Sequence, residues 1–200
     1  MPHTRAARAT GEPGEVEVLD ALPATTVVFD LETQRLFEDV GGRFPEELGL
    51  AVAVSWDKEN GFREWWENDA QALVAELSRF QQVVGFNILR FDYEVLSPYQ
   101  PEVLGLLSGK TMDVLSDIYS TLGFRIKLTD LAEATLGRAK TADGIEAVRL
   151  WRQGEKQRVV EYCQADVALT RDLYAYGLTR GELYYPSYGL KRSVHVDWRS

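Results

Sequence analysis

The amino-acid sequence predicts an α/β domain in which a mixed central sheet of about five strands is flanked by helices. Three observations predict this class. Apolar, β-branched runs of strand length gather in the first half of the chain, and segments with helical periodicity fill the second half. No repeat or low-complexity linker divides the 200 residues, a length typical of one globular domain. This order of elements is typical of a sheet that helices cover.

Five segments are expected as strands: 25–31, 48–56, 61–66, 82–86 and 110–112. The first is β-branched and continuously apolar up to Phe29, which is typical of a buried central strand. Asn60-Gly61 separates the second segment from the third and is a strong hairpin signal. The sheet is therefore expected to begin with a buried strand and to include one hairpin.

Six segments are expected as helices: 69–80, 91–96, 114–122, 128–136, 143–153 and 155–176. In the first of them, Leu73, Val74, Leu77 and Phe80 recur with the helical period. The C-terminal tail is rich in Tyr (Tyr184, Tyr185, Tyr188) and is expected to form an extended pair with 194–198; no function is assigned to it. Residues 1–20 are polar and rich in Gly, Pro, Ala and Glu, so we expect them to be disordered and 21–200 to form a single domain.

Composition narrows the chemistry to carboxylates. The chain has one Cys and two His, which excludes a disulfide framework and zinc sites built from clustered Cys and His. Neither His lies near a plausible nucleophile, which disfavours a Ser-His-Asp hydrolase. No apolar run reaches the roughly 18 residues of a membrane span and no signal-peptide core is visible, so we expect a cytoplasmic protein without a membrane partner. The net charge of −9 argues against a polyanionic partner unless metal ions intervene.

Asp30 and Glu32 form the first notable pair of acids. They end the first strand and are two residues apart, so on a strand they point to the same face. Two carboxylates on one buried face repel each other and lose hydration, and a divalent cation compensates for both effects. The alternative is a turn acid followed by a solvated acid.

Two further acids follow along the chain. Asp92 lies in the loop after the fourth strand, where a helix cap is the ordinary explanation. Tyr162 and Asp166 are four residues apart and therefore share one face of the last predicted helix. Taken alone, Asp166 is equally compatible with a surface acid beside a packed Tyr.

Taken in order, these residues resemble a known family. The pattern is D-x-E on the first strand, N-x(3)-F-D after a later strand, and Y-x(3)-D on a late helix. It is similar to the DEDD superfamily of 3′–5′ exonucleases, which have the RNase H-like fold. Tyr162 matches the Tyr of the DEDDy branch, whereas the other branch has a His where this chain has Glu161.

The resemblance implies a two-metal mechanism with Mg²⁺ or Mn²⁺. It implies that Asp30 bridges two ions, that Glu32 and Asp166 help to hold the ion that activates water, and that Asp92 acts through water on the second ion's side. Tyr162 is implied to orient the attacking water, because an ordinary phenol, with a pKa of about 10, is a poor base at neutral pH.

The resemblance also implies contacts with the terminal nucleotide, made by Leu31, Thr33, Asn87 and Phe91. For Phe91 the alternative is a core aromatic, and for Asn87 a side chain that closes its own loop. The implied substrate is the 3′ end of single-stranded DNA or RNA. Residues 125–158 hold eight basic and five acidic side chains, which suit either a phosphate backbone or solvated helix faces.

Three questions stay open at this point. Trp65-Trp66 can stack on bases, although one of the two is expected to face the core. The sequence identifies no helicase or polymerase partner. A catalytically silent binding module on the same fold and an RNase H-like endonuclease remain as alternatives to the exonuclease.

Overall fold

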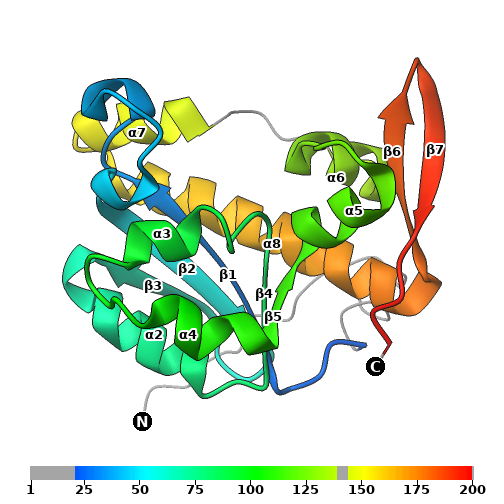
Figure 1. Ribbon diagram of the computed structural model, residues 1–200, viewed down its shortest axis with the longest axis horizontal. Coiled ribbons are helices and arrows are strands. Elements are labelled where there is room, and N and C mark those ends of the chain that lie inside the picture. The colour runs from blue at the N-terminus through cyan, green and yellow to red at the C-terminus, as the bar shows by residue number, and fades with distance from the viewer. Residues whose placement is uncertain (1–20, 139–143, 200) are drawn as a thin grey trace, which may run out of the picture.

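The computed structural model describes residues 21–138 and 144–199, and a five-stranded sheet in the order β3-β2-β1-β4-β5 lies at its centre (Figure 1). The strands are β1 (Thr26–Thr33), β2 (Leu50–Asp57), β3 (Gly61–Trp66), β4 (Gln82–Gly85) and β5 (Thr111–Asp113). β2 runs antiparallel to both β1 and β3, whereas β4 and β5 continue the sheet in parallel with β1. The predicted mixed sheet flanked by helices is confirmed.

Helices cover both faces of this sheet. One face carries α2 (Ala70–Ser78), α3 (Asp92–Leu96) and α4 (Val103–Leu107), which pack on Phe29 and Leu31. The other face carries α5 (Val114–Leu122), α6 (Leu128–Leu136), α7 (Gly144–Arg152) and α8 (Lys156–Arg180), which pack on Val28 and Val54. Short 3₁₀ helices lie in the connections between described elements: η1 (Phe37–Val40), η2 (Pro45–Glu47), η3 (Glu67–Asp69) and η4 (Ser108–Lys110).

Each predicted helix has a counterpart among the described residues, and most boundaries agree to within two residues. α8 extends to Arg180, four residues beyond the predicted end, because its αL cap is Gly181 at φ 73°. The sequence did not predict α4, which has five residues and contains Gly105. Asp143, the predicted start of the helix now seen as α7, lies outside the described residues, as does the expected disordered segment 1–20.

The C-terminal tail forms an extended pair as expected, but its second strand is Leu190–His195 and not the predicted 194–198. β6 (Glu182–Ser187) and β7 (Leu190–His195) make a separate two-stranded sheet that lies beside α6 (Figure 1, orange and red). The hydroxyl of Thr135 on α6 donates to the backbone carbonyl of Tyr184 and accepts from its N–H, both at 2.9 Å. α6 therefore covers this edge of β6. Within the described residues, no helix combines the length and the apolar character needed to cross a bilayer.

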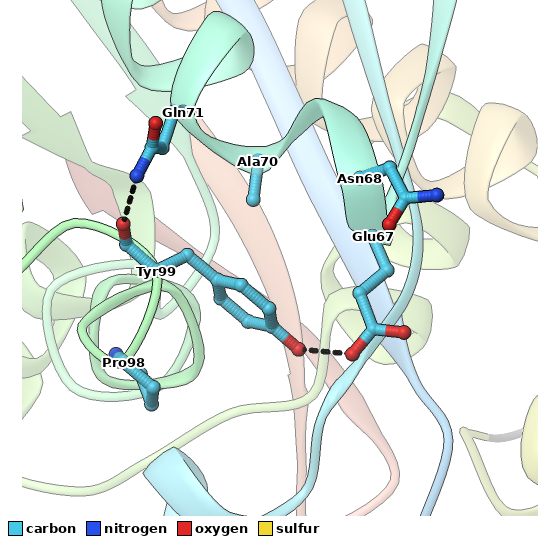
Figure 2. A pocket seen from close by; sticks show the side chains of 6 residues that line it. All are labelled: Glu67, Asn68, Ala70, Gln71, Pro98 and Tyr99. Atoms are coloured by element: carbon cyan, nitrogen blue, oxygen red, sulfur yellow. Dashed lines mark hydrogen bonds between the residues drawn. The ribbon is translucent and has the colours of Figure 1, made fainter.

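A polar hollow of about 440 Å³ lies between the start of α2 and the loop after α3 (Figure 2). The Tyr99 hydroxyl donates to Glu67 Oε1 at 2.7 Å and accepts the backbone N–H of Leu50 at 3.1 Å. The amide of Gln71 donates to the Tyr99 carbonyl oxygen at 3.1 Å. These bonds attach the loop after α3 to the sheet, and none of the sequence-predicted site residues lines the hollow.

Candidate metal centre at the end of β1

The alternation of side chains along β1 decides which face carries the acids. Phe29 and Leu31 point into the core beneath α2 and α3, and Val28 points into the core beneath α8. Asp30 and Glu32 share the parity of Val28, so both carboxylates lie on the side of the sheet that faces α8. The two-residue spacing places both acids on the helix-covered face of the central strand.

The last residues of β1, which we call its open end, pair with a neighbouring strand on one side only. β4 pairs with β1 only from Thr26 to Val28, whereas β2 pairs with β1 from Val27 to Thr33. The pairing with β2 shifts register between Glu32 and Thr33. Among the described residues, β1 therefore has no strand partner on its β4 side beyond Val28. This position is at the carboxyl end of the parallel strands, where open α/β sheets commonly bind ligands.

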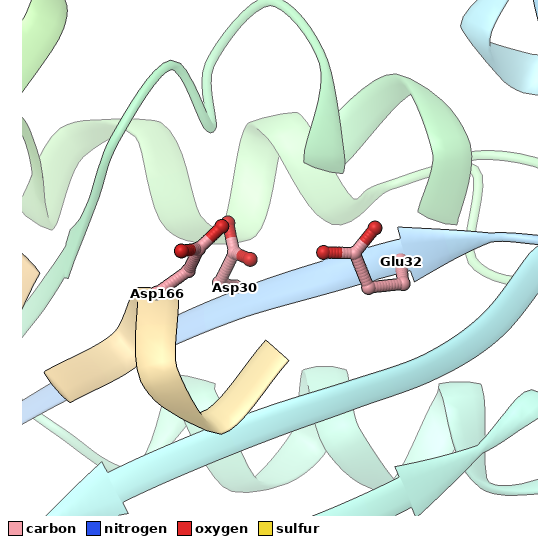
Figure 3. Close-up of side chains that lie close together, drawn as sticks. All are labelled: Asp30, Glu32 and Asp166. Carbon is pink, nitrogen blue, oxygen red and sulfur yellow. The ribbon is translucent and has the colours of Figure 1, made fainter. Parts of the chain in front are cut away.

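α8 brings the third carboxylate to the same place. Ligand oxygens of Asp30, Glu32 and Asp166 all lie within 4.8 Å of one another. Figure 3 shows the Asp166 side chain reaching from α8 toward Asp30, with the Glu32 carboxylate on the same side of β1. Tyr162 lies one helical turn before Asp166 and packs, half buried, against the core.

Burial of these carboxylates has an electrostatic cost that a bound cation would offset. Glu32 is 7% exposed and Asp166 is 8% exposed, so both carboxylates have lost most of their hydration. Carboxylates this close repel one another when they are ionised. Three oxygen donors from separate side chains are the ligand type that Mg²⁺ and Mn²⁺ prefer. The residues present therefore fit a hard divalent ion.

Asp92 is not part of the cluster that Asp30, Glu32 and Asp166 form, but it lies near β1. It is the first residue of α3, is 2% exposed, and accepts a hydrogen bond from the backbone N–H of Leu31. Burial, and secondarily the negative charge of Asp113, raise the pKa of Asp92 well above its ordinary value, although backbone hydrogen bonds partly oppose this. Its Oδ1 atom is buried and has no hydrogen-bond partner within the described part of the chain.

Cys163 is the neighbour that sequence reasoning missed. Its thiol lies between α8 and β1, where Sγ donates to the backbone carbonyl of Asp30 at 3.3 Å. Burial raises the pKa of this thiol well above its usual value, and the charges of Asp30, Glu32 and Asp166 add to the effect. The sequence signal that could have identified Cys163 as a neighbour of the acids is its position three residues before Asp166, because this spacing puts both side chains on one helix face.

The four residues expected to contact the nucleotide differ in their burial and in their contacts. The Leu31 side chain is 4% exposed and packs in the core, so its backbone is the part nearest the acids. The Thr33 hydroxyl donates to the Arg35 carbonyl at 2.9 Å. Asn87 Oδ1 accepts from Arg125 at 2.8 Å, and Phe91 packs on the core and meets Phe37 edge to face at 6.1 Å.

The basic stretch and the Trp pair take part mainly in the fold. Four of the arginines from 125–158 pair with acids, as Arg138–Asp172, Arg149–Glu146, Arg152–Asp39 and Arg158–Glu155. Trp65 donates to the Ser55 hydroxyl at 2.8 Å, and Trp66 stacks on Trp151 with ring centroids 6.4 Å apart. The two Trp side chains point to opposite faces of β3 and each packs against a core cluster.

Comparisons with known proteins agree with this architecture. A family model described as the RNase H superfamily matches residues 27–177. A sequence search of curated proteins finds no match. Among solved structures, the chain is similar to the family B DNA polymerase from the hyperthermophilic archaeon Pyrobaculum calidifontis, with a TM-score of 0.59 and 17% identity. That match covers 76% of this chain and 24% of the polymerase, so this likeness shows the fold alone.

Proposed function

Because the chain belongs to the RNase H superfamily, we propose that it is a metal-dependent nuclease that removes nucleotides from the 3′ ends of single-stranded DNA or RNA. The observation that carries the proposal is the convergence of Asp30, Glu32 and Asp166 to within 4.8 Å at the open end of β1. The 3′ polarity rests on the D-x-E, N-x(3)-F-D and Y-x(3)-D pattern, which resembles that of DEDDy exonucleases.

The carboxylates are the groups expected to hold Mg²⁺ or Mn²⁺. Asp30 and Glu32 from β1 and Asp166 from α8 would hold the ion that activates water, with Asp30 shared with a second ion on the side toward α3, where Asp92 would act. Bound divalent ions supply stabilisation of the charge that develops on the phosphate and lower the pKa of bound water. The buried, unpartnered Oδ1 of Asp92 supports a polar partner on that side.

The remaining residues orient the substrate and the water. Tyr162 is proposed to hydrogen-bond the attacking water, because it lies one turn from Asp166 on the same face of α8. The backbone of Leu31 and the side chain of Thr33 lie at the end of β1 and are proposed to position the terminal nucleotide. Asn87 is proposed as a further contact; Phe91 is less suited, since it packs on the core.

A degradation assay on matched single-stranded DNA and RNA oligonucleotides tests the proposal. With a label at the 5′ end, we expect a ladder that shortens from the 3′ end in Mg²⁺ or Mn²⁺ and disappears in EDTA. Asp30→Asn is expected to abolish the ladder because it removes a charged ligand from the cluster. Release that starts from the 5′ end contradicts the polarity, and activity that persists in EDTA contradicts the metal requirement.

Two alternatives are separated by further measurements. An RNase H-like endonuclease cuts a circular single-stranded substrate, whereas an exonuclease leaves it intact because it has no end. A silent binding module is distinguished by calorimetry: absence of divalent-ion binding at millimolar concentrations favours it. Conversely, binding that Asp30→Asn weakens favours the enzyme.

A further inference from the structure

We propose that Asp113 is a positioning residue for Asp92. Its carboxylate holds the loop between β4 and α3 in the conformation that delivers Asp92 to the open edge of β1. The inference rests on the proposed function, because it assigns Asp92 to the reaction. Asp113 lies at the end of β5 and pairs with Gly85, the last residue of β4, where that loop begins.

Three N–H groups donate to this one carboxylate. Oδ1 accepts from the backbone of Ser116 at 3.1 Å, which makes Asp113 the N-cap of α5. Oδ1 also accepts from Asn87 at 2.8 Å, and Oδ2 accepts from Leu89 at 3.0 Å. The cap uses only one of these bonds. The other two cross to a loop far away in sequence, and Asp113 is 3% exposed, so solvent does not replace them readily.

The loop has features that need such support. Asn87 has φ 69°, a left-handed conformation that residues other than Gly seldom adopt. The chain folds back closely on β4, since a Cβ on Gly85 would lie 2.3 Å from Ile88 Cγ2. Arg125, which follows the C-terminus of α5, donates to Asn87 Oδ1 at 2.8 Å. Residues at both ends of α5 therefore hold Asn87, one through its backbone and one through its side chain.

This support extends directly to Asp92. The N–H of Tyr93 donates to the carbonyl of Ile88 at 3.0 Å, so the turn that Asp113 holds also fixes the first turn of α3. Asp92 lies within that turn and meets the backbone N–H of Leu31. A ligand to a metal must keep its geometry within fractions of an ångström, and residues that orient ligands matter for that reason.

Two substitutions separate the loop contacts from the helix cap. Asp113→Ser keeps a hydroxyl that can cap Ser116, but its single oxygen does not serve Asn87 and Leu89 as well. Asp113→Asn keeps an acceptor for Ser116 and Asn87 and places an amide N–H opposite the N–H of Leu89. Gly61→Ala is the control for general destabilisation, because Gly61, the first residue of the distant β3, has φ 70° with nothing within 4 Å of a Cβ.

Kinetics give the first measurement. In Mn²⁺, we expect Asp113→Ser to lower kcat for oligonucleotide degradation by about tenfold or more, in the range seen when groups that orient metal ligands are removed. KM for the oligonucleotide is expected to change little, and Asp113→Asn to lie between Asp113→Ser and the wild type. Gly61→Ala is expected to keep wild-type kcat. Wild-type kcat in Asp113→Ser overturns the proposal.

Hydrogen exchange gives the second measurement and does not depend on activity. In Asp113→Ser, amides of 86–92 are expected to exchange faster than in the wild type, while those of 114–122 stay protected. Faster exchange confined to 114–122, or spread evenly as in Gly61→Ala, overturns the proposal and leaves only a helix cap. If the wild-type protein degrades no oligonucleotide, the proposed function fails, and the exchange data still decide whether Asp113 holds the loop.

Discussion

The Sγ atom of Cys163 lies 3.3 Å from the backbone carbonyl oxygen of Asp30 and 3.9 Å from its Oδ2 atom. This contact joins α8 to β1 directly beneath the acidic cluster. A small, weakly polar thiol suits the position because it packs like an apolar side chain and still donates a weak hydrogen bond. The lone Cys of the chain thus supports the backbone from which Asp30 projects.

The environment of Cys163 predicts low thiol reactivity. Burial raises the pKa of the thiol, and Asp30, Glu32 and Asp166 add to the shift, so the reactive thiolate is scarce at neutral pH. We expect the native protein to react slowly with a chromogenic disulfide reagent and to react fully once urea unfolds it. Equal rates in the native and unfolded protein contradict this prediction.

Neutralising Asp166 is expected to reduce the stabilisation of the fold by metal. A ligand that binds only the folded state stabilises it by about 2.7 kcal/mol at a hundred times its Kd. Mn²⁺ should therefore raise the Tm of the wild-type protein, and Asp166→Asn should lose most of that increase because one of three clustered carboxylates is neutral. Glu102→Gln, an exposed change at the start of α4, is the matched control. An equal Mn²⁺ effect in Asp166→Asn and the control contradicts the assignment.

The close packing around Gly177, far from the acidic cluster, predicts that Gly177→Ala lowers the stability of the fold. A Cβ at this position of α8 would lie 2.2 Å from the ring of Trp198, which packs at a tilt against Tyr174 and donates to Asp117 Oδ2 at 2.8 Å. Gly177→Ala must displace this ring and should destabilise the protein by about 1–3 kcal/mol in urea titrations. Gly109→Ala, which meets open space, should cause no such loss. A normal midpoint for Gly177→Ala contradicts this account.

Much of the fold follows from local patterns. The apolar run in β1, the Asn60-Gly61 turn and the helical spacing of Leu73 and Leu77 predicted elements that the structure contains. The two-residue spacing of Asp30 and Glu32 predicted a shared strand face, and the structure puts both on the side of α8. Local periodicity is strong in these segments, so tertiary contacts did not need to be known.

Other features depend on contacts that no local pattern encodes. Asp113 precedes α5 and caps it locally, but its bonds to Asn87 and Leu89 arise from the parallel pairing of β4 and β5. α4 was missed because five residues around Gly105 carry little periodicity. The sequence placed Cys163 on the core-facing side of the last predicted helix, but its contact with Asp30 depends on how α8 crosses the sheet.

Asp92 predicts a pH dependence of stability in the metal-free protein. Its pKa is raised in the folded state, chiefly by burial, so the folded protein holds a proton that the unfolded chain releases near pH 3.9. Stability should therefore decrease as the pH rises from about 4 toward the raised folded-state pKa, because the unfolded state binds fewer protons over this range. Above that pKa the penalty is complete, and each unit of upward shift corresponds to about 1.4 kcal/mol.

Asp92→Asn removes this titration while it keeps an oxygen for the Leu31 N–H. In EDTA at neutral pH we expect the variant to be more stable than the wild type, and the difference to shrink as the pH falls toward 4. The same variant should lose activity, because the amide is a poor substitute for a charged ligand on that side of the site. Urea unfolding across pH tests the first expectation. A wild-type protein that gains stability over Asp92→Asn as the pH rises from 4 to 7 has the opposite sign and contradicts the raised pKa.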